Sequence, residues 1–176
     1  MIGHIPELIG AGIDSFKIEG RMKTALYAAV TARTYRCAID DYFKDPELYQ
    51  SRLPWYREEI RKCTYRDFTT GFFYGKPDSS AQIYDSNTYH RSWTYLGTVE
   101  AVDDRGRACF PQKNRFFVGD RLEIMKKDGT NVTAEVLAIE GRDGLPVQSA
   151  PHPQEPLKVM LEPAAEPGDI LRAEEK

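Results

Sequence analysis

The 176-residue sequence is 41% hydrophobic and 29% charged, which excludes a disordered or membrane-embedded chain and suits one ordinary domain or two small ones. The formal net charge is −3, but residues 1–77 hold 12 Lys and Arg against 10 Asp and Glu, whereas residues 78–176 hold 12 against 17. The second half is therefore not a generally basic nucleic-acid-binding surface, and any such role needs a local patch.

The first elements have the order of an α/β repeat. Pro6 and Glu7 suit the first turn of a short helix, which Gly10 ends. The alternation of apolar and polar residues over 13–18 then predicts a strand. Because a parallel strand needs neighbours in its sheet, we expect the chain to be the C-terminal part of a larger protein. The alternative is an independent α+β domain that pairs this strand with a downstream one.

A long amphipathic helix is predicted from about Met22 to Lys44, with Arg33 and Arg36 away from its apolar stripe. Asp45-Pro46 ends this helix, because the residue before a proline disfavours helical backbone angles. A second, shorter helix is predicted after Pro54. The expected apolar stripe of the long helix consists of Ala28, Ala32, Tyr35, Ile39 and Phe43.

After a polar linker over residues 78–91, short strands and Gly/Asp turns dominate the sequence. Turns are predicted at Asp103–Gly106 and Lys127–Thr130, the second of them a hairpin. Several short strands at regular spacing are typical of a small antiparallel barrel or sandwich. The expected strands are 95–102, 107–111, 121–125, 131–140, 157–161 and 170–172.

The three cysteines, Cys37, Cys63 and Cys109, are odd in number and widely spaced. They predict no disulfide framework and favour a reducing, cytoplasmic setting. Since they form no C-x-x-C pair, we expect no metal site from this chain alone.

Three motifs together resemble peptidase family U32, the collagenase-like peptidase family. They are DSFKIEGRMK at 14–23, YRCAID at 35–40 and FTTGFFYGKP at 68–77. The later KNRFFVGD at 113–120 is similar to the β-barrel extension at the C-terminus of that family. The resemblance covers nearly the whole chain.

The resemblance implies an α/β barrel that carries the active region and contributes only its last strand and helix to this sequence. The expected fold class is therefore α+β, an N-terminal helical remnant of a TIM-like α/β barrel followed by a small antiparallel β-barrel. Residues 1–50 would be the tail of the catalytic domain, residues 51–85 a helical connector and loop, and residues 86–176 the β-barrel.

Two kinds of enzyme are implied for the parent protein, and this chain alone is expected to be inactive. The family was classed with collagenase-like peptidases, but several members resemble enzymes that hydroxylate the wobble uridine of transfer RNA with prephenate, or a ribosomal RNA cytidine. Such members often carry an iron–sulfur cluster on cysteines, which we expect in the full-length protein and not in this part.

The implied partners are the N-terminal barrel of the same chain and a macromolecular substrate. Our first interpretation is that the β-barrel recognises RNA. The alternatives are a peptidase whose barrel binds peptide, and a non-catalytic docking or oligomerisation module.

Lys17, Glu19 and Arg21 are the candidate catalytic residues, because α/β barrels place their functional groups at the carboxyl ends of strands. Glu19 could act as a general base, and Arg21 could clamp a carboxylate or phosphate. The alternative is a structural charge network at the barrel mouth.

Residues 105–117 form the one basic and aromatic patch of the sequence. Its cations could pair with phosphates while its rings stack on bases. The alternative, which the acidic surroundings favour, places the rings in the core and the cations on a solvated rim. The candidate nucleic-acid-binding residues are Arg105, Arg107, Lys113 and Arg115, near Phe110, Phe116 and Phe117.

Overall fold

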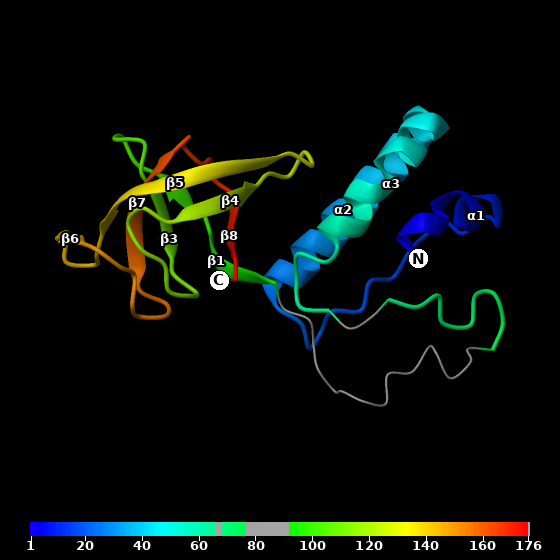
Figure 1. Ribbon diagram of the computed structural model, residues 1–176, viewed down its shortest axis with the longest axis horizontal. Coiled ribbons are helices and arrows are strands. Elements are labelled where there is room, and N and C mark those ends of the chain that lie inside the picture. Colours follow the sequence, from blue (N-terminus) through cyan, green and yellow to red (C-terminus); the bar gives the residue numbers. More distant parts are fainter. Residues whose placement is uncertain (66–67, 77–91, 176) are drawn as a thin grey trace. The chain divides into compact units, whose positions relative to one another are not determined.

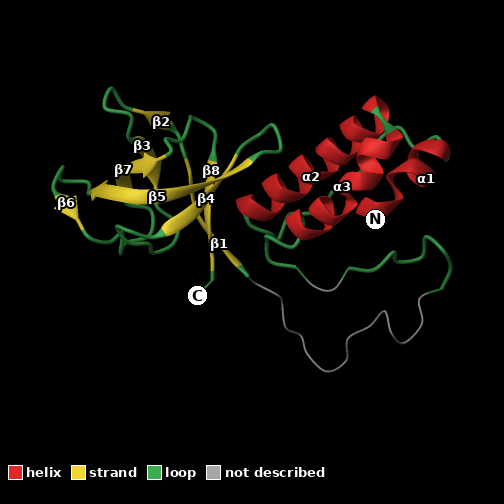
Figure 2. Ribbon diagram, turned by 45° about the horizontal axis from the view of Figure 1, so that its top comes forward, coloured by secondary structure: helices red, strands yellow, loops and turns green. Residues whose placement is uncertain are grey.

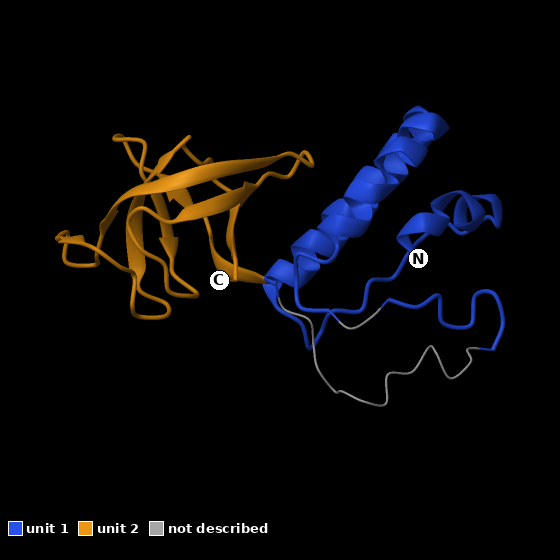
Figure 3. Ribbon diagram, in the orientation of Figure 1, with its two compact units in different colours: residues 1–92 blue, residues 93–176 orange. Residues whose placement is uncertain are grey.

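The computed structural model describes residues 1–65, 68–76 and 92–175, in two compact units, residues 1–92 and 93–176 (Figures 1 and 3). We call them the helical unit and the β unit and describe each by itself. The predicted linker at 78–91 lies outside the described residues. In the described part of the chain, no helix is long and apolar enough to cross a membrane.

The helical unit contains three α-helices after a 3-10 turn at Ile2–His4 (Figure 2). They are α1 (Ile5–Gly10), α2 (Ala25–Lys44) and α3 (Pro46–Glu59). The break at Asp45-Pro46 is confirmed, because the Asp45 carboxylate accepts a 2.9 Å hydrogen bond from Glu47 N and so caps α3. The predicted start of this helix after Pro54 is wrong, because Pro54 lies inside α3.

The buried face of α2 is not the predicted one. Val30 and Ala38 are fully buried, Ala38 in one cluster with Tyr49 and Tyr56 of α3, whereas Phe43 is 71% exposed. The helix carries apolar residues on two faces, and the position of α3 decides which face is buried. As a result Arg33, which was expected to point away from the apolar stripe, is buried against α3.

The strand predicted at residues 13–18 is not formed, and the segment from Ile13 to Gly20 has no regular secondary structure. Isolated strands leave their backbone groups unpaired, and in the described residues no other strand lies in the helical unit. Residues 13–18 therefore alternate between apolar and polar side chains, but among the described residues of this unit they have no neighbouring strand with which to form a sheet.

The β unit is one antiparallel sheet with strand order β1-β8-β4-β5-β7-β3-β2 and β6 paired to β5. This confirms the α+β class and the antiparallel strands, but the pairings between described strands do not close the sheet into a barrel. The Lys113 backbone N–H donates to Leu96 O at 2.8 Å and brings the end of β3 beside β1. The strands are β1 (Trp93–Thr98), β2 (Ala101–Val102), β3 (Ala108–Pro111), β4 (Arg121–Met125), β5 (Asn131–Glu140), β6 (Pro146–Val147), β7 (Pro156–Glu162) and β8 (Ile170–Glu174).

Strand β5 shows how the core of the β unit is built. Ala134 and Val136 are buried in the core, two residues apart, but Ala138 is exposed and Ile139 is buried instead. The pairing of β5 with β7 shifts register between Val136 and Ala138. A bulge of one residue reverses the inward and outward positions that follow it, which accounts for the change.

Candidate functional site

The three predicted catalytic residues lie in the irregular segment before α2. Lys17, Glu19 and Arg21 are exposed, and the Arg21 backbone N–H donates to the Glu19 carboxylate at 3.0 Å. Within the described residues, no ion pair joins the three side chains, so the expected charge network is not present. Lys17 and Glu19 border a hollow of about 430 Å³ that also contacts Tyr27 and Tyr35. Their catalytic role stays a prediction.

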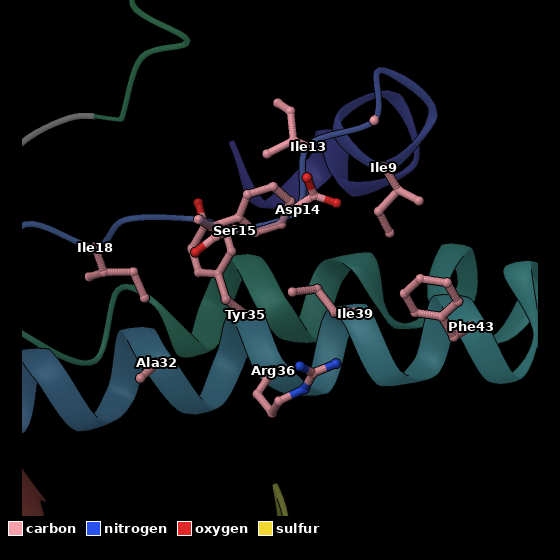
Figure 4. A pocket seen from close by; sticks show the side chains of 12 residues that line it. Ile9, Ile13, Asp14, Ser15, Ile18, Ala32, Tyr35, Arg36, Ile39 and Phe43 are labelled. Carbon is pink, nitrogen blue, oxygen red and sulfur yellow. The ribbon is translucent and has the colours of Figure 1, made fainter.

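An open groove of about 620 Å³ lies on the same side of the helical unit. Figure 4 shows Tyr35, Ile39 and Phe43 of α2 on one side, with Ile13 and Ile18 of the irregular segment on the other. This face of α2 is the stripe that the sequence predicted to be buried.

The predicted basic patch is divided by strand β3, with Arg105 and Arg107 before it and Lys113 and Arg115 after it. Arg107 pairs with Asp103 at 2.7 Å and with Glu140 at the end of β5. Two carboxylates thus neutralise this guanidinium, and it holds the β2–β3 turn in place.

The carboxyl of Asp103 titrates differently from a free aspartate. The side-chain hydrogen bond from Arg107, with further backbone N–H donors, lowers the pKa of Asp103 from its ordinary 3.8 to about 2. Because the pKa of Asp103 is lower in the folded chain than in the unfolded chain, its ionised carboxylate stabilises the fold above about pH 4. This contribution is lost as the pH falls toward 2.

We therefore expect Asp103→Asn to reduce the loss of stability between pH 4 and pH 2, because the variant has no carboxyl to protonate there. Urea unfolding at a series of acidic pH values measures this slope. The exposed neighbour Asp104→Asn removes a charge from the same turn and is the control. Equal slopes for Asp103→Asn and the original chain would contradict the assignment.

On the loop between β3 and β4, the half-buried Lys113 and the exposed Arg115 and Phe117 form an edge, here called the 113–117 edge. The guanidinium carbon of Arg115 lies 4.8 Å from the centre of the Phe117 ring, which is 41% exposed. Phe110 and Phe116 instead lie in the core, stacked 6.2 Å apart. The predicted core role of the rings thus holds for two of the three, and the third is available at the surface beside a cation.

An open cleft of about 640 Å³ adjoins this edge and was not predicted from the sequence. It is formed by the turn after β5 and by residues 147–155, a segment rich in proline and polar residues that has no periodicity. The turn at Arg142–Gly144 was its only sequence signal. The lining residues are Gly141, Arg142, Asp143, Val147, Gln148, Ser149, Pro151, His152 and Glu155.

The cysteines do not fit an iron–sulfur cluster. Cys37 lies on α2, Cys109 lies in β3 of the other unit, and the buried Cys63 thiol donates to Ile60 O. In the part of the chain that the structure describes, no three His, Cys, Asp or Glu side chains gather as metal ligands.

Two family models match this sequence, Peptidase family U32 over residues 1–83 and Peptidase family U32 C-terminal domain over residues 91–172. The chain belongs to peptidase family U32. The family resemblance of the motifs at 14–23, 35–40, 68–77 and 113–120 is thereby confirmed.

Several U32 relatives carry names that refer to transfer RNA. The tRNA hydroxylation protein P1 of Bacillus subtilis (strain 168) is 35% identical over 173 residues, 98% of this chain and 41% of that protein. The tRNA hydroxylation protein P of Escherichia coli (strain K12) is 31% identical over 148 residues, 83% of this chain and 32% of that protein. The chain thus spans less than half the length of these relatives.

Other U32 relatives carry peptidase names. The Uncharacterized protease MJ0090 of Methanocaldococcus jannaschii is 43% identical over 74 residues, 42% of this chain and 17% of that protein. Among solved structures, the C-terminal domain of a "putative U32 peptidase" from Geobacillus thermoleovorans matches with a TM-score of 0.41 and 27% identity, over 46% of this chain and 99% of that one.

Proposed function

We propose that the β unit binds transfer RNA as part of a longer U32 protein that hydroxylates it. The observation that carries the proposal is the 113–117 edge, where the half-buried Lys113 is followed by the exposed Arg115–Phe117 pair. A cation beside an exposed ring can pair with a phosphate while the ring stacks on a base. The names of the two relatives that refer to tRNA hydroxylation support the choice of RNA.

Two of the four candidate residues lie on the edge, Lys113 and Arg115. Arg105 lies apart from it, in the turn between β2 and β3. Arg107 is held by Asp103 and Glu140, so it has little charge to offer a phosphate. Lys113 only shares a neutral hydrogen bond of 2.9 Å with Gln154, and in the described residues Arg115 has no carboxylate partner. A local patch of this kind is what RNA binding requires in a unit whose other surface is acidic.

Replacing both Lys113 and Arg115 with alanine should weaken tRNA binding and lower the slope of log affinity against log salt by about 1.5, because two phosphate contacts are lost. Fluorescence anisotropy of labelled transfer RNA with the 176-residue chain, from low to moderate salt, measures both quantities.

The matched control is Arg121→Ala with Lys127→Ala, which removes the same charge from exposed positions elsewhere in the β unit. Equal losses in both double variants would mean that only net charge matters. Absence of tRNA binding at low salt would overturn the proposal, and cleavage of gelatin by the longer protein would favour the peptidase alternative.

We also infer that the groove on α2 packs against the α/β barrel that the family resemblance places elsewhere in the longer protein. Phe43, Ile13 and Ile18 are 71%, 42% and 38% exposed, an unusual concentration of large apolar side chains for a solvated surface. The iron–sulfur cluster expected for such proteins would have to use cysteines of that other region.

Phe43→Gln tests the groove in two chain lengths. In the 176-residue chain the free energy of unfolding should change by no more than about 0.5 kcal/mol, because the ring is exposed. In a longer chain that includes the barrel it should fall by about 2 kcal/mol, the loss expected for a buried phenylalanine ring. Equal effects in urea unfolding of the two chains would rule out this packing.

A further inference from the structure

We propose that the open cleft beside the 113–117 edge holds one unpaired guanine base of the bound RNA. The inference rests on the proposed RNA binding and adds a base preference to it. The cleft, of about 640 Å³, falls within the usual range of small-ligand sites, about 300–1,000 Å³.

The cleft and the edge share a wall. Phe117 and Ser149 are directly opposite in an antiparallel bridge, with Val118 N donating to Gln148 O and Ala150 N to Phe116 O, each at 3.0 Å. Residues opposite each other in such a pair project to the same side. Since Ser149 lines the cleft, we infer that the exposed Phe117 ring, opposite it in the bridge, projects beside the cleft.

Buried Gln112 fixes the far part of this wall. Its backbone N–H donates to Glu155 O at 2.9 Å, its backbone carbonyl accepts from Gln154 N at 2.7 Å, and its side-chain amide donates to Ala150 O. These bonds hold residues 150–155 at both ends, so the cleft is formed before any ligand binds. A preformed site loses less entropy on binding than one that must be ordered.

The chemistry inside the cleft differs from that of its rim. Asp143 and Glu155 bring two carboxylates to the floor, where a methyl group on Gly141 would lie 3.3 Å from Asp143 Oδ1 and 3.7 Å from Glu155 Oε1. In the described residues no cation pairs with either carboxylate. The two carboxylates and Arg142 give the cleft a formal charge of −1, so the cleft disfavours phosphate. Phosphate is instead attracted by Lys113 and Arg115 of the neighbouring edge.

Such a floor suits a base that offers hydrogen-bond donors. Guanine presents adjacent N1–H and N2–H groups on its Watson–Crick edge, and one carboxylate can accept both. Uracil offers a single N–H flanked by two carbonyl oxygens, which the carboxylates repel. Arg142, His152 and Phe117 provide planar groups for stacking, as in other proteins that read unstacked RNA bases.

The test compares two single-stranded RNA hexamers, UUGUUU and UUUUUU, by anisotropy with the 176-residue chain at low salt. The guanine hexamer should bind roughly tenfold more tightly, the discrimination of one good bidentate contact. Asp143→Asn and Glu155→Gln should each reduce this ratio because they replace an acceptor with a donor. Gly141→Val should also reduce it by filling the floor without changing the charge.

The readout is the ratio of the two affinities, which a general change in charge does not alter. Asp104→Asn, which removes one charge from an exposed turn, should leave the ratio intact. Equal binding of the two hexamers, or a ratio that survives in all three cleft variants, would overturn the guanine site while tRNA binding stands. Loss of all RNA binding by the unaltered chain would overturn both proposals.

Discussion

Replacing Glu59 with alanine should lower the free energy of unfolding of the helical unit by about 3–5 kcal/mol. The Glu59 carboxylate pairs with Arg33, and the side chains are only 1% and 6% exposed. Removing the carboxylate leaves the Arg33 guanidinium charge buried between α2 and α3, away from water. The free-energy cost of burying that charge without the carboxylate is larger than the net stabilisation that the intact pair provides. Urea unfolding followed by the helical circular dichroism signal measures the loss.

An exposed ion pair within α2 provides the control. Arg36 pairs with Asp40, and these side chains are 59% and 63% exposed. Asp40→Ala should therefore cost no more than about 0.5 kcal/mol. Similar losses for Glu59→Ala and Asp40→Ala would show that the pair between α2 and α3 is not buried in solution.

Local signals were enough to predict much of the β unit. Strands β4 and β5 have the predicted bounds, because the hairpin between them is specified by its own residues. Gly129 adopts a φ of 94°, and the Asp128 carboxylate accepts from Thr130 N at 2.9 Å. A turn of this kind fixes the register of the two strands that it joins.

Features that depend on distant residues could not be predicted. The burial of Arg33 requires Glu59, which follows 26 residues later, and the neutralisation of Arg107 requires Glu140, 33 residues away. Nothing in the windows around these arginines distinguishes them from Arg36 or Arg115. The sequence therefore indicated a basic patch of four residues, whereas only two of them gather at the 113–117 edge.

The cleft escaped prediction for a similar reason. Residues 147–155 form almost no regular structure, and they line a cleft only because Gln112 and the bridge at Phe117 hold them beside the β3–β4 loop. Sequence patterns report periodic burial, which such a segment lacks.

Replacing Glu123 with alanine should destabilise the β unit to a similar extent, by about 3–5 kcal/mol. Arg172 of β8 is fully buried and lies opposite Glu123 of β4 in the sheet register. Its Nε donates to the Glu123 carboxylate at 2.8 Å, and its guanidinium carbon lies 5.2 Å from the Trp93 ring. Without Glu123, this charge would remain in the sheet without the carboxylate that accepts from its Nε.

Two further variants distinguish the destabilisation caused by a buried charge from the destabilisation caused by lost packing. Glu166→Ala removes the exposed partner of Lys126 and should cost no more than about 1 kcal/mol. Arg172→Met combined with Glu123→Leu removes both charges and should recover most of the stability that Glu123→Ala loses, because apolar side chains can replace a buried pair. Trp93 fluorescence during urea unfolding, in a Trp55→Phe background, reports each transition. If the double variant were as unstable as Glu123→Ala, lost packing, and not the buried Arg172 charge without the Glu123 carboxylate, would account for the lower free energy of unfolding.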